Sequence, residues 1–379
     1  KLYTNLLTNN TSIFDVTFGN FGLAFGYIDR GNINLQGFNI ANSTLSANTS
    51  YVGGLVGRIG ILGILDLHNI YISKSTINGS LNNSNYVGGL VGYAGNANEN
   101  NIDVNEIHIT SSEFSGKNYI GGLFGKAYGL TLDSIYIYST TIGKSGSGAY
   151  VGGFVGEAKN INISRCYYGG GTGASNLMGS IYVGGFVGAA ENINVFNSML
   201  NIGNFTIENK AKDVDYKQEI VYVPGENGDL VEKTQNILSS GGVVGYAKYG
   251  ESGHLLQNID VIIGTLATQN IFGGIVGYVE GMNIFEVSTK IDNVTSGSGN
   301  VRGIAYTLKN CGTCSNWYAE NYWLFNPSTS NLLGNFSSSL TMAYAKYASP
   351  MALGKEDDNY NETVVYSTRT ITTDTGKTK

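Results

Sequence analysis

The residues best suited to chemistry in this chain are its cysteines, histidines and a few carboxylates. Two of the three cysteines are spaced as Cys311-Gly-Thr-Cys314, which could form a tight disulfide, a redox pair or half of a metal site. A zinc site would need a second such pair or two nearby histidines, and the three histidines stand apart in the sequence. A redox pair needs a βαβ context that is missing here. We therefore expect a structural clip or plain thiols, with no metal and no other cofactor.

Carboxylates on neighbouring repeats could cleave a polysaccharide if two of them met on one wall. Hydrolysis of a glycosidic bond needs two carboxyl groups about 5–9 Å apart. Glu157 and Glu191 occupy nearly the same repeat position, but both are typical of solvated turn residues. No His-Glu-x-x-His, Gly-x-Ser-x-Gly or phosphate-binding glycine motif occurs. We expect a protein that is not an enzyme, with a polysaccharide lyase or hydrolase as the alternative. The candidate carboxylates are Asp103, Glu106, Asp133, Glu157 and Glu191.

These residues are positioned by a repeated phrase, Tyr-Val-Gly-Gly-Leu-Val-Gly, which is first clear at residues 51–57. The first glycine of each pair lies at 53, 88, 121, 152, 184, 241 and 273, so most steps are 31 to 35 residues and one is 57. Self-similarity at such a period is typical of repeat architectures. In a stack of coils each position lies directly under its counterpart, so a side chain at a sharp bend would collide with its neighbours above and below. Glycine removes the Cβ and allows positive φ, so we expect the pairs to form a column at one corner. The column consists of Gly53, Gly54, Gly88, Gly89, Gly121, Gly122, Gly152, Gly153, Gly184, Gly185, Gly241, Gly242, Gly273 and Gly274.

After each glycine phrase comes an alternating segment such as Asn69-Ile-Tyr-Ile72 and then a short closing one such as Ser75-Thr-Ile77. Period-two alternation predicts strands with one buried face. Decayed copies at both ends bring the count to about nine repeats. The predicted fold is all-β, a parallel β-helix (solenoid) of about nine coils with three short strands per coil over residues 1–310. A propeller is the rival, but its blades are longer and have four strands.

The tyrosine that opens the phrase should stack from coil to coil, which stabilises each pair by about 0.5–1.5 kcal/mol beyond burial. Internal packing is the simpler interpretation of this aromatic column, and a carbohydrate-binding strip is the alternative. Its members are Tyr51, Tyr86, Tyr119, Tyr150 and Tyr182.

Three segments depart from the repeat. Residues 205–238 account for the long step and concentrate charges, which predicts an inserted hairpin that is either a tolerated loop or a partner-contact arm. Residues 311–352 contain both tryptophans and are predicted to form an aromatic cap on the open end of the stack, with a ligand-binding platform as the alternative. Residues 353–379 are polar and predicted to be a tail or linker.

Composition limits the partners. The net charge of −6 argues against nucleic acid, which requires a clustered basic surface. No apolar run is long enough for a transmembrane helix. The hydrophobic fraction of 42% and the 26 tyrosines are too apolar for disorder. The start at Lys1, without methionine, fits a segment of something longer.

The Gly-Gly-Leu-Val-Gly phrase over residues 20–310 resembles the GLUG motif of bacterial filamentous-haemagglutinin-type adhesins and of the non-catalytic region of IgA-cleaving metallopeptidases. The resemblance implies an extracellular or cell-surface β-solenoid and carries no catalytic residues onto this chain. The expected partners are a host-surface protein or glycan, or copies of the chain itself in a homo-oligomer, filament or surface layer.

Overall fold

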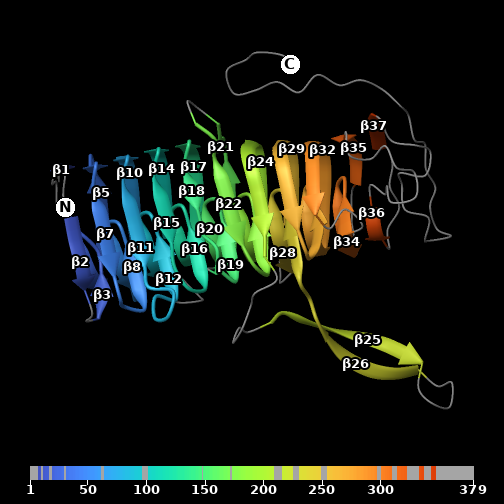
Figure 1. The fold of residues 1–379 in the computed structure, drawn as a ribbon, viewed down its shortest axis with the longest axis horizontal. Coiled ribbons are helices and arrows are strands. Elements are labelled where there is room, and N and C mark those ends of the chain that lie inside the picture. The colour runs from blue at the N-terminus through green and yellow to red at the C-terminus, as the bar shows by residue number, and fades with distance from the viewer. Residues whose placement is uncertain are drawn as a thin grey trace.

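The computed structural model describes residues 7–9, 12–16, 19–29, 31–60, 64–95, 101–146, 148–170, 173–208, 216–224, 230–248, 254–296, 300–309, 314–321, 333–336 and 343–346. Every secondary-structure element in these ranges is a β-strand. Strands of successive repeats lie side by side along the long axis of the molecule (Figure 1). The predicted fold class, an all-β parallel solenoid with a repeat of about 32 residues, is confirmed.

The Tyr-Val-Gly part of each phrase forms one strand of a nine-stranded sheet. Each strand pairs in parallel with its counterpart in the next coil, so that Tyr86 lies between Tyr51 and Tyr119. The strands of this sheet are β3 (Asn20–Phe21), β8 (Tyr51–Gly53), β12 (Tyr86–Gly88), β16 (Tyr119–Gly121), β19 (Tyr150–Gly152), β23 (Tyr182–Gly184), β27 (Ser239–Gly241), β30 (Ile271–Gly273) and β33 (Val301–Arg302).

A second sheet of 26 strands holds the rest of each coil. Its first half comprises β1 (Leu7–Asn9), β2 (Ser12–Val16), β4 (Phe25–Ile28), β5 (Asn32–Gln36), β6 (Asn39–Ala41), β7 (Thr44–Ala47), β9 (Val56–Ile59), β10 (Ile64–Ser73), β11 (Thr76–Gly79), β13 (Val91–Ala94), β14 (Asn101–Thr110), β15 (Glu113–Ser115) and β17 (Phe124–Tyr138). Its second half comprises β18 (Thr141–Ile142), β20 (Val155–Ser164), β21 (Tyr167–Gly169), β22 (Asn176–Gly179), β24 (Val187–Ile207), β28 (Val244–Lys248), β29 (His254–Thr268), β31 (Val276–Glu280), β32 (Met282–Ser296), β34 (Ala305–Lys309), β35 (Cys314–Asn321), β36 (Leu333–Phe336) and β37 (Ala343–Lys346).

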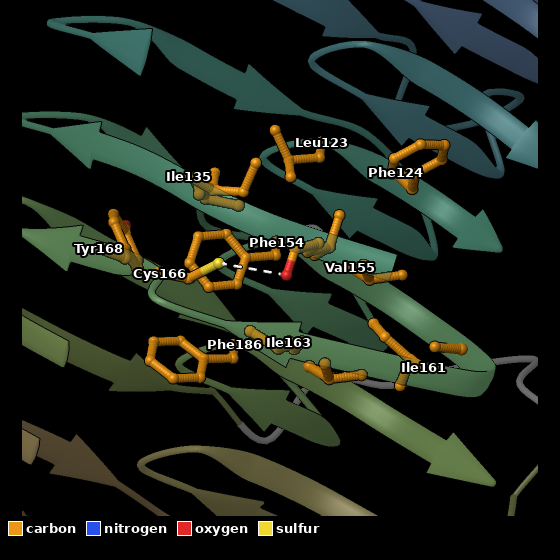
Figure 2. Close-up of a cluster of buried hydrophobic side chains, with 14 of the residues drawn as sticks. Leu123, Phe124, Ile135, Phe154, Val155, Ile161, Ile163, Cys166, Tyr168 and Phe186 are labelled. Atoms are coloured by element: carbon orange, nitrogen blue, oxygen red, sulfur yellow. Dashed lines mark hydrogen bonds between the residues drawn. The ribbon is translucent and has the colours of Figure 1, made fainter. Parts of the chain in front are cut away.

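The glycine phrase forms two strands rather than one, because the chain bends at Gly54-Leu55 between β8 and β9. The bend directs both halves of the phrase inward: Val52, Leu55 and Val56 are all fully buried. Figure 2 shows the interior several coils further on, where Phe154 and Phe186 lie side by side with ring centroids 4.9 Å apart.

The paired glycines lie in register, and of the two properties of glycine invoked for them the missing Cβ is the one that matters, since none of them has a positive φ. A Cβ on Gly54 would lie 2.1 Å from the carbonyl oxygen of Gly89, its counterpart in the next coil. The same holds at Gly153, whose Cβ would meet the Gly185 oxygen at 2.0 Å. These positions need glycine because two backbones approach closely there, not because of a left-handed conformation.

The left-handed residues lie at other corners, within the alternating segments. Asn69 has a φ of 55°, and the chain turns there while the stack stays in register on both sides. Asparagine tolerates this conformation better than most side chains. Its in-register counterparts with positive φ are Gly37, Glu106, Ser134, Arg165, Asn197, Asn258 and Glu286.

A column of buried hydroxyl groups follows the next corner and was not predicted. The Ser43 N–H donates to Ser75 Oγ at 3.2 Å, and the Ser75 N–H donates to Ser112 Oγ at 3.2 Å. Each hydroxyl also donates to the carbonyl two residues before it, as Ser75 does to Ser73 at 2.8 Å. The hydroxyls therefore satisfy backbone groups that the corner withdraws from the sheet ladder.

The inserted segment forms an antiparallel hairpin, β25 (Gln218–Pro224) and β26 (Leu230–Asn236), which extends away from the stack (Figure 1). The hairpin begins later than residue 205, because Phe205 and Ile207 are buried in β24 and pair with both neighbouring coils. In the predicted cap, β35, β36 and β37 continue the parallel pairing as further rungs. The rest of residues 311–352, including Cys311, and all of residues 353–379 lie outside the described residues.

Gly153→Ala should destabilise the stack by about 3 kcal/mol or more, because its Cβ would overlap a carbonyl oxygen of the next coil. Urea unfolding followed by circular dichroism measures the change. The matched control is Gly170→Ala, where no atom of the described residues lies within 4 Å of the added carbon and φ is not positive. The control should change stability by less than about 1 kcal/mol. Equal stabilities of the two variants would contradict the close-approach argument.

Candidate functional site

Five tyrosines stack along the outside of the nine-stranded sheet. Consecutive ring centroids from Tyr51 to Tyr182 are 5.1, 4.8, 4.6 and 4.8 Å apart, with interplanar angles that grow from 5° to 37°. We call Tyr51, Tyr86, Tyr119, Tyr150 and Tyr182 the tyrosine ladder. It ends at Tyr182 because the position that pairs in the next coil is occupied by Ser239. The rings use their faces on one another, so little ring face remains for stacking on a ligand.

The hairpin covers one end of this ladder. Tyr150 and Tyr182 are buried, whereas the three earlier rungs are half-buried. The Tyr182 hydroxyl donates to the Ile237 carbonyl at 2.7 Å and accepts from the Lys217 N–H at 2.6 Å. The Tyr278 hydroxyl donates a hydrogen bond to the Glu219 carboxylate at 3.0 Å. Residues at both ends of the hairpin are therefore fixed to the rod.

Cations lie over the tyrosine rings. Arg58 lies 4.9 Å from the centroid of Tyr51, and Lys126 lies 5.2 Å from that of Tyr119. Lys217, which precedes β25, lies 5.6 Å from the Tyr150 ring. Such contacts are each worth about 0.5–1 kcal/mol at exposed sites and more when desolvated.

Glu157 joins two of these cations. Its carboxylate contacts Lys126 Nζ at 2.5 Å and Lys217 Nζ at 2.6 Å, and its side chain is 13% exposed. Burial alone would raise the pKa of Glu157, but the two ammonium groups outweigh it and the net pKa is lowered. Burial alone would lower the pKa of Lys126, but the charge and hydrogen bond of Glu157 outweigh it, so the net pKa of Lys126 is raised. The prediction that Glu157 is a solvated turn residue is wrong, because the hairpin covers it.

A cavity of about 520 Å³ lies beside this ionic cluster. We call it the foot pocket, because Lys217 at the foot of the hairpin forms part of its wall. Lys159 and Glu191, from adjacent coils, form an ion pair of 2.7 Å in the wall, and Lys248 follows in register. The pocket is lined by Lys126, Tyr128, Glu157, Ala158, Lys159, Ala190, Glu191, Lys217, Tyr246 and Lys248.

The predicted candidate carboxylates are only partly brought together. Glu157 and Glu191 both line the foot pocket, each paired with lysine. Asp133 is bonded to Ser164 at 2.6 Å and to Arg165 on another face. Asp103 and Glu106 are exposed on β14.

A second aromatic stack was missed. Tyr71, His108 and Tyr136 occupy one in-register column, with centroids 5.1 and 5.2 Å apart. The sequence signal was the aromatic residue between the two isoleucines of each alternating segment. Tyr71, at the end of this stack, is 45% exposed.

Cys166 is a free, buried thiol in the core. Burial raises the pKa of Cys166 to about 12, so the thiol stays protonated at neutral pH. The predicted Cys311–Cys314 clip cannot be placed, since Cys311 lies outside the described residues. Within the described ranges no three His, Cys, Asp or Glu residues are grouped to hold a metal ion. No helix in those same ranges could span a membrane.

Comparisons with family models, with curated proteins and with solved structures gave no match.

Glu157→Gln should destabilise the protein by about 3 kcal/mol, because it leaves Lys126 partly buried without a counter-charge. Chemical denaturation measures the loss. Glu191→Gln is the matched control, since the Lys159–Glu191 pair is more exposed and should contribute less than about 1 kcal/mol. The double variant Lys126→Gln plus Glu157→Gln should recover part of the loss, because the more buried lysine is then neutral and the remaining unpaired Lys217 is more exposed. A loss no larger than that of the control would refute the role of Glu157.

The contribution of Glu157 should depend on pH in one direction. Its folded pKa lies below the usual value of 4.5, so its stabilising effect is complete above about pH 4.5 and is lost as pH falls through the folded pKa. The stability difference between wild type and Glu157→Gln should be the same at about pH 7 and pH 5.5 and smaller at about pH 3. A difference that grows on acidification would contradict the assigned ion pairs.

Proposed function

We propose that this chain is a secreted or cell-surface bacterial β-solenoid protein that does no catalysis and presents an extended surface for attachment to cells or glycans. The observation that carries the proposal is the hairpin arm, which extends from the stacked coils (Figure 1) and is hydrogen-bonded to them at its foot. The resemblance of the glycine phrase to the GLUG motif of bacterial adhesins agrees with it.

The arm, the hairpin of β25 and β26, exposes apolar side chains to solvent. Ile220 is 59% exposed and Val231 is 50% exposed, more than Tyr27, Tyr71 or Leu81, which are 46%, 45% and 38% exposed. An isolated two-stranded ribbon is marginally stable in water, yet this one is fixed to the rod by Lys217 and Glu219. The register places Ile220 and Val231 on opposite faces of the ribbon, so a partner that covers both contacts the arm from two sides.

The chemistry of the foot pocket supports a non-catalytic role. A general acid for glycoside cleavage needs a raised pKa, whereas the two lysines lower the pKa of Glu157. Glu191 is likewise paired with Lys159. The pocket therefore favours binding over proton transfer, which makes the polysaccharide-degrading enzyme the weakest of the three alternatives.

Self-assembly into an extracellular filament or surface layer is the second candidate. At the N-terminal end, β1 and β2 pair on one side only within the described residues. An open strand edge is a template for pairing with another chain. Light scattering distinguishes the two: a particle of about 40 kDa favours the attachment protein, and polymers favour the filament.

The arm should be required for attachment. Fluorescently labelled chain should bind saturably to cultured animal cells or to a glycan array, and the double variant Ile220→Ser plus Val231→Ser should bind at least about fivefold more weakly. The reason is the loss of two exposed apolar contacts of roughly 1 kcal/mol or more each.

The matched control is Leu81→Ser, which removes an exposed hydrophobic side chain far from the arm in sequence and should leave binding unchanged. The foot of the hairpin is intact in all three proteins. Absence of saturable binding by the intact chain, or equal binding by the arm variant, would overturn the proposal.

A further inference from the structure

The foot pocket lies between the rod and the hairpin and is large enough for a sugar residue. Its volume of about 520 Å³ is within the range of small-molecule sites, roughly 300–1,000 Å³. Ala158 and Ala190 line it with small side chains, while Tyr128 and Tyr246 supply aromatic wall. The pocket depends on the hairpin, because Lys217 is held in place by Glu157 and by the Tyr182 hydroxyl.

The charge of the pocket opposes that of the whole protein. Four lysines line it against two glutamates, which gives 4 − 2 = +2 in a chain of net charge −6. The four are Lys126, Lys159, Lys217 and Lys248. Glu280, in register beside Lys248, and Glu219, near Tyr246, are not among the lining residues, so the excess of +2 is that of the pocket wall itself. A concave site with this excess should attract an anion.

Two of the lysines are available to a ligand. Lys126 and Lys159 are each engaged by a glutamate. Lys217 shares Glu157 with Lys126 and keeps a third of its side chain exposed. Lys248 is exposed and has no ion pair within the described part of the chain, although it is in register with Glu191 and Glu280. Lys217 and Lys248 can therefore donate to a carboxylate.

The glutamates indicate what else the ligand must carry. A bare phosphate would be repelled by Glu157 and Glu191, whereas hydroxyl groups would donate to their carboxylate oxygens. A ligand with one acid group and several hydroxyls can bind both the lysine ammonium groups and the glutamate carboxylates of the pocket. The half-buried Tyr128 ring offers an apolar surface for the C–H groups of such a ligand.

We propose that the foot pocket binds an acidic sugar, a uronic or sialic acid residue of a glycan, with its carboxylate on Lys217 and Lys248 and its hydroxyls on Glu157 and Glu191. This deepens the proposed attachment function and rests on it. Ile220 and Val231 on the strands of the arm make the apolar contact, and the pocket at its foot selects for charge.

Isothermal titration calorimetry of the full chain tests this with 3′-sialyllactose and digalacturonic acid, which separate the two kinds of acidic sugar. Lactose is the neutral analogue, and inorganic phosphate is the bare anion. At least one acidic sugar should bind about tenfold or more tighter than lactose and phosphate, because a charge-assisted hydrogen bond contributes about that factor. Its affinity should fall with added salt.

Lys248→Gln should weaken acidic-sugar binding about tenfold and leave stability unchanged, since the residue is exposed. Lys217→Gln should also weaken acidic-sugar binding, but it removes the contact of Lys217 with Glu157 and so loosens the hairpin. Lys248→Gln is therefore the decisive variant. Lys233→Gln removes an exposed charge from the hairpin outside the pocket and is the matched control. Equal binding of lactose, tighter binding of phosphate, no binding of any sugar, or no effect of Lys248→Gln would each overturn the acidic-sugar site. These outcomes would leave the proposed attachment by the arm untouched, because that is tested separately by Ile220→Ser plus Val231→Ser.

Discussion

The structure depends on one constraint: each coil must lie a single strand spacing, about 4.8 Å, from the next, with every residue above its counterpart. At that distance each residue contacts the equivalent residue of the next coil, so a side chain that recurs in every repeat forms a column along the stack. The column can be favourable, as for stacked rings, or impossible, as for a Cβ aimed at the next carbonyl. The glycine pairs and the tyrosine ladder are opposite consequences of the same spacing.

The same constraint builds the candidate site. Lys126 and Glu157 face each other because they occupy one register position in adjacent coils, and Lys159 and Glu191 do so in the next column. The insertion then places Lys217 over the cluster and converts an exposed face into a walled pocket. The repeats place the charged residues in columns, and the inserted hairpin makes the site concave. Solenoids commonly place insertions on their binding face, and this hairpin follows that rule.

The periodic features could be predicted from the sequence, whereas those that depend on side chains meeting between distant segments could not. The period, the parallel stack and the identity of the stacked columns follow from the spacing of one phrase. The collision that excludes side chains at the paired glycines follows from the stacking itself, whereas the positive φ does not occur there, because sequence alone does not distinguish positive φ from close approach. Corner residues such as Asn69 and Glu106 share a backbone conformation but no residue type, so no pattern marks them. Glu157 looked solvated because nothing in the sequence places the hairpin above it.

The most direct test of the account is a set of distances along one outward column. Asp66, Asn194 and Asn283 occupy the same register position, with Asn194 four coils and Asn283 six coils from Asp66. Spin labels at Asp66 and Asn194, and at Asp66 and Asn283, in a chain with its cysteines replaced by serine, would report the spacing by pulsed electron paramagnetic resonance. The stack predicts separations of about 19 and 29 Å, a difference of two coil steps. Separations that do not increase with coil number would contradict the in-register solenoid and the pocket built on it.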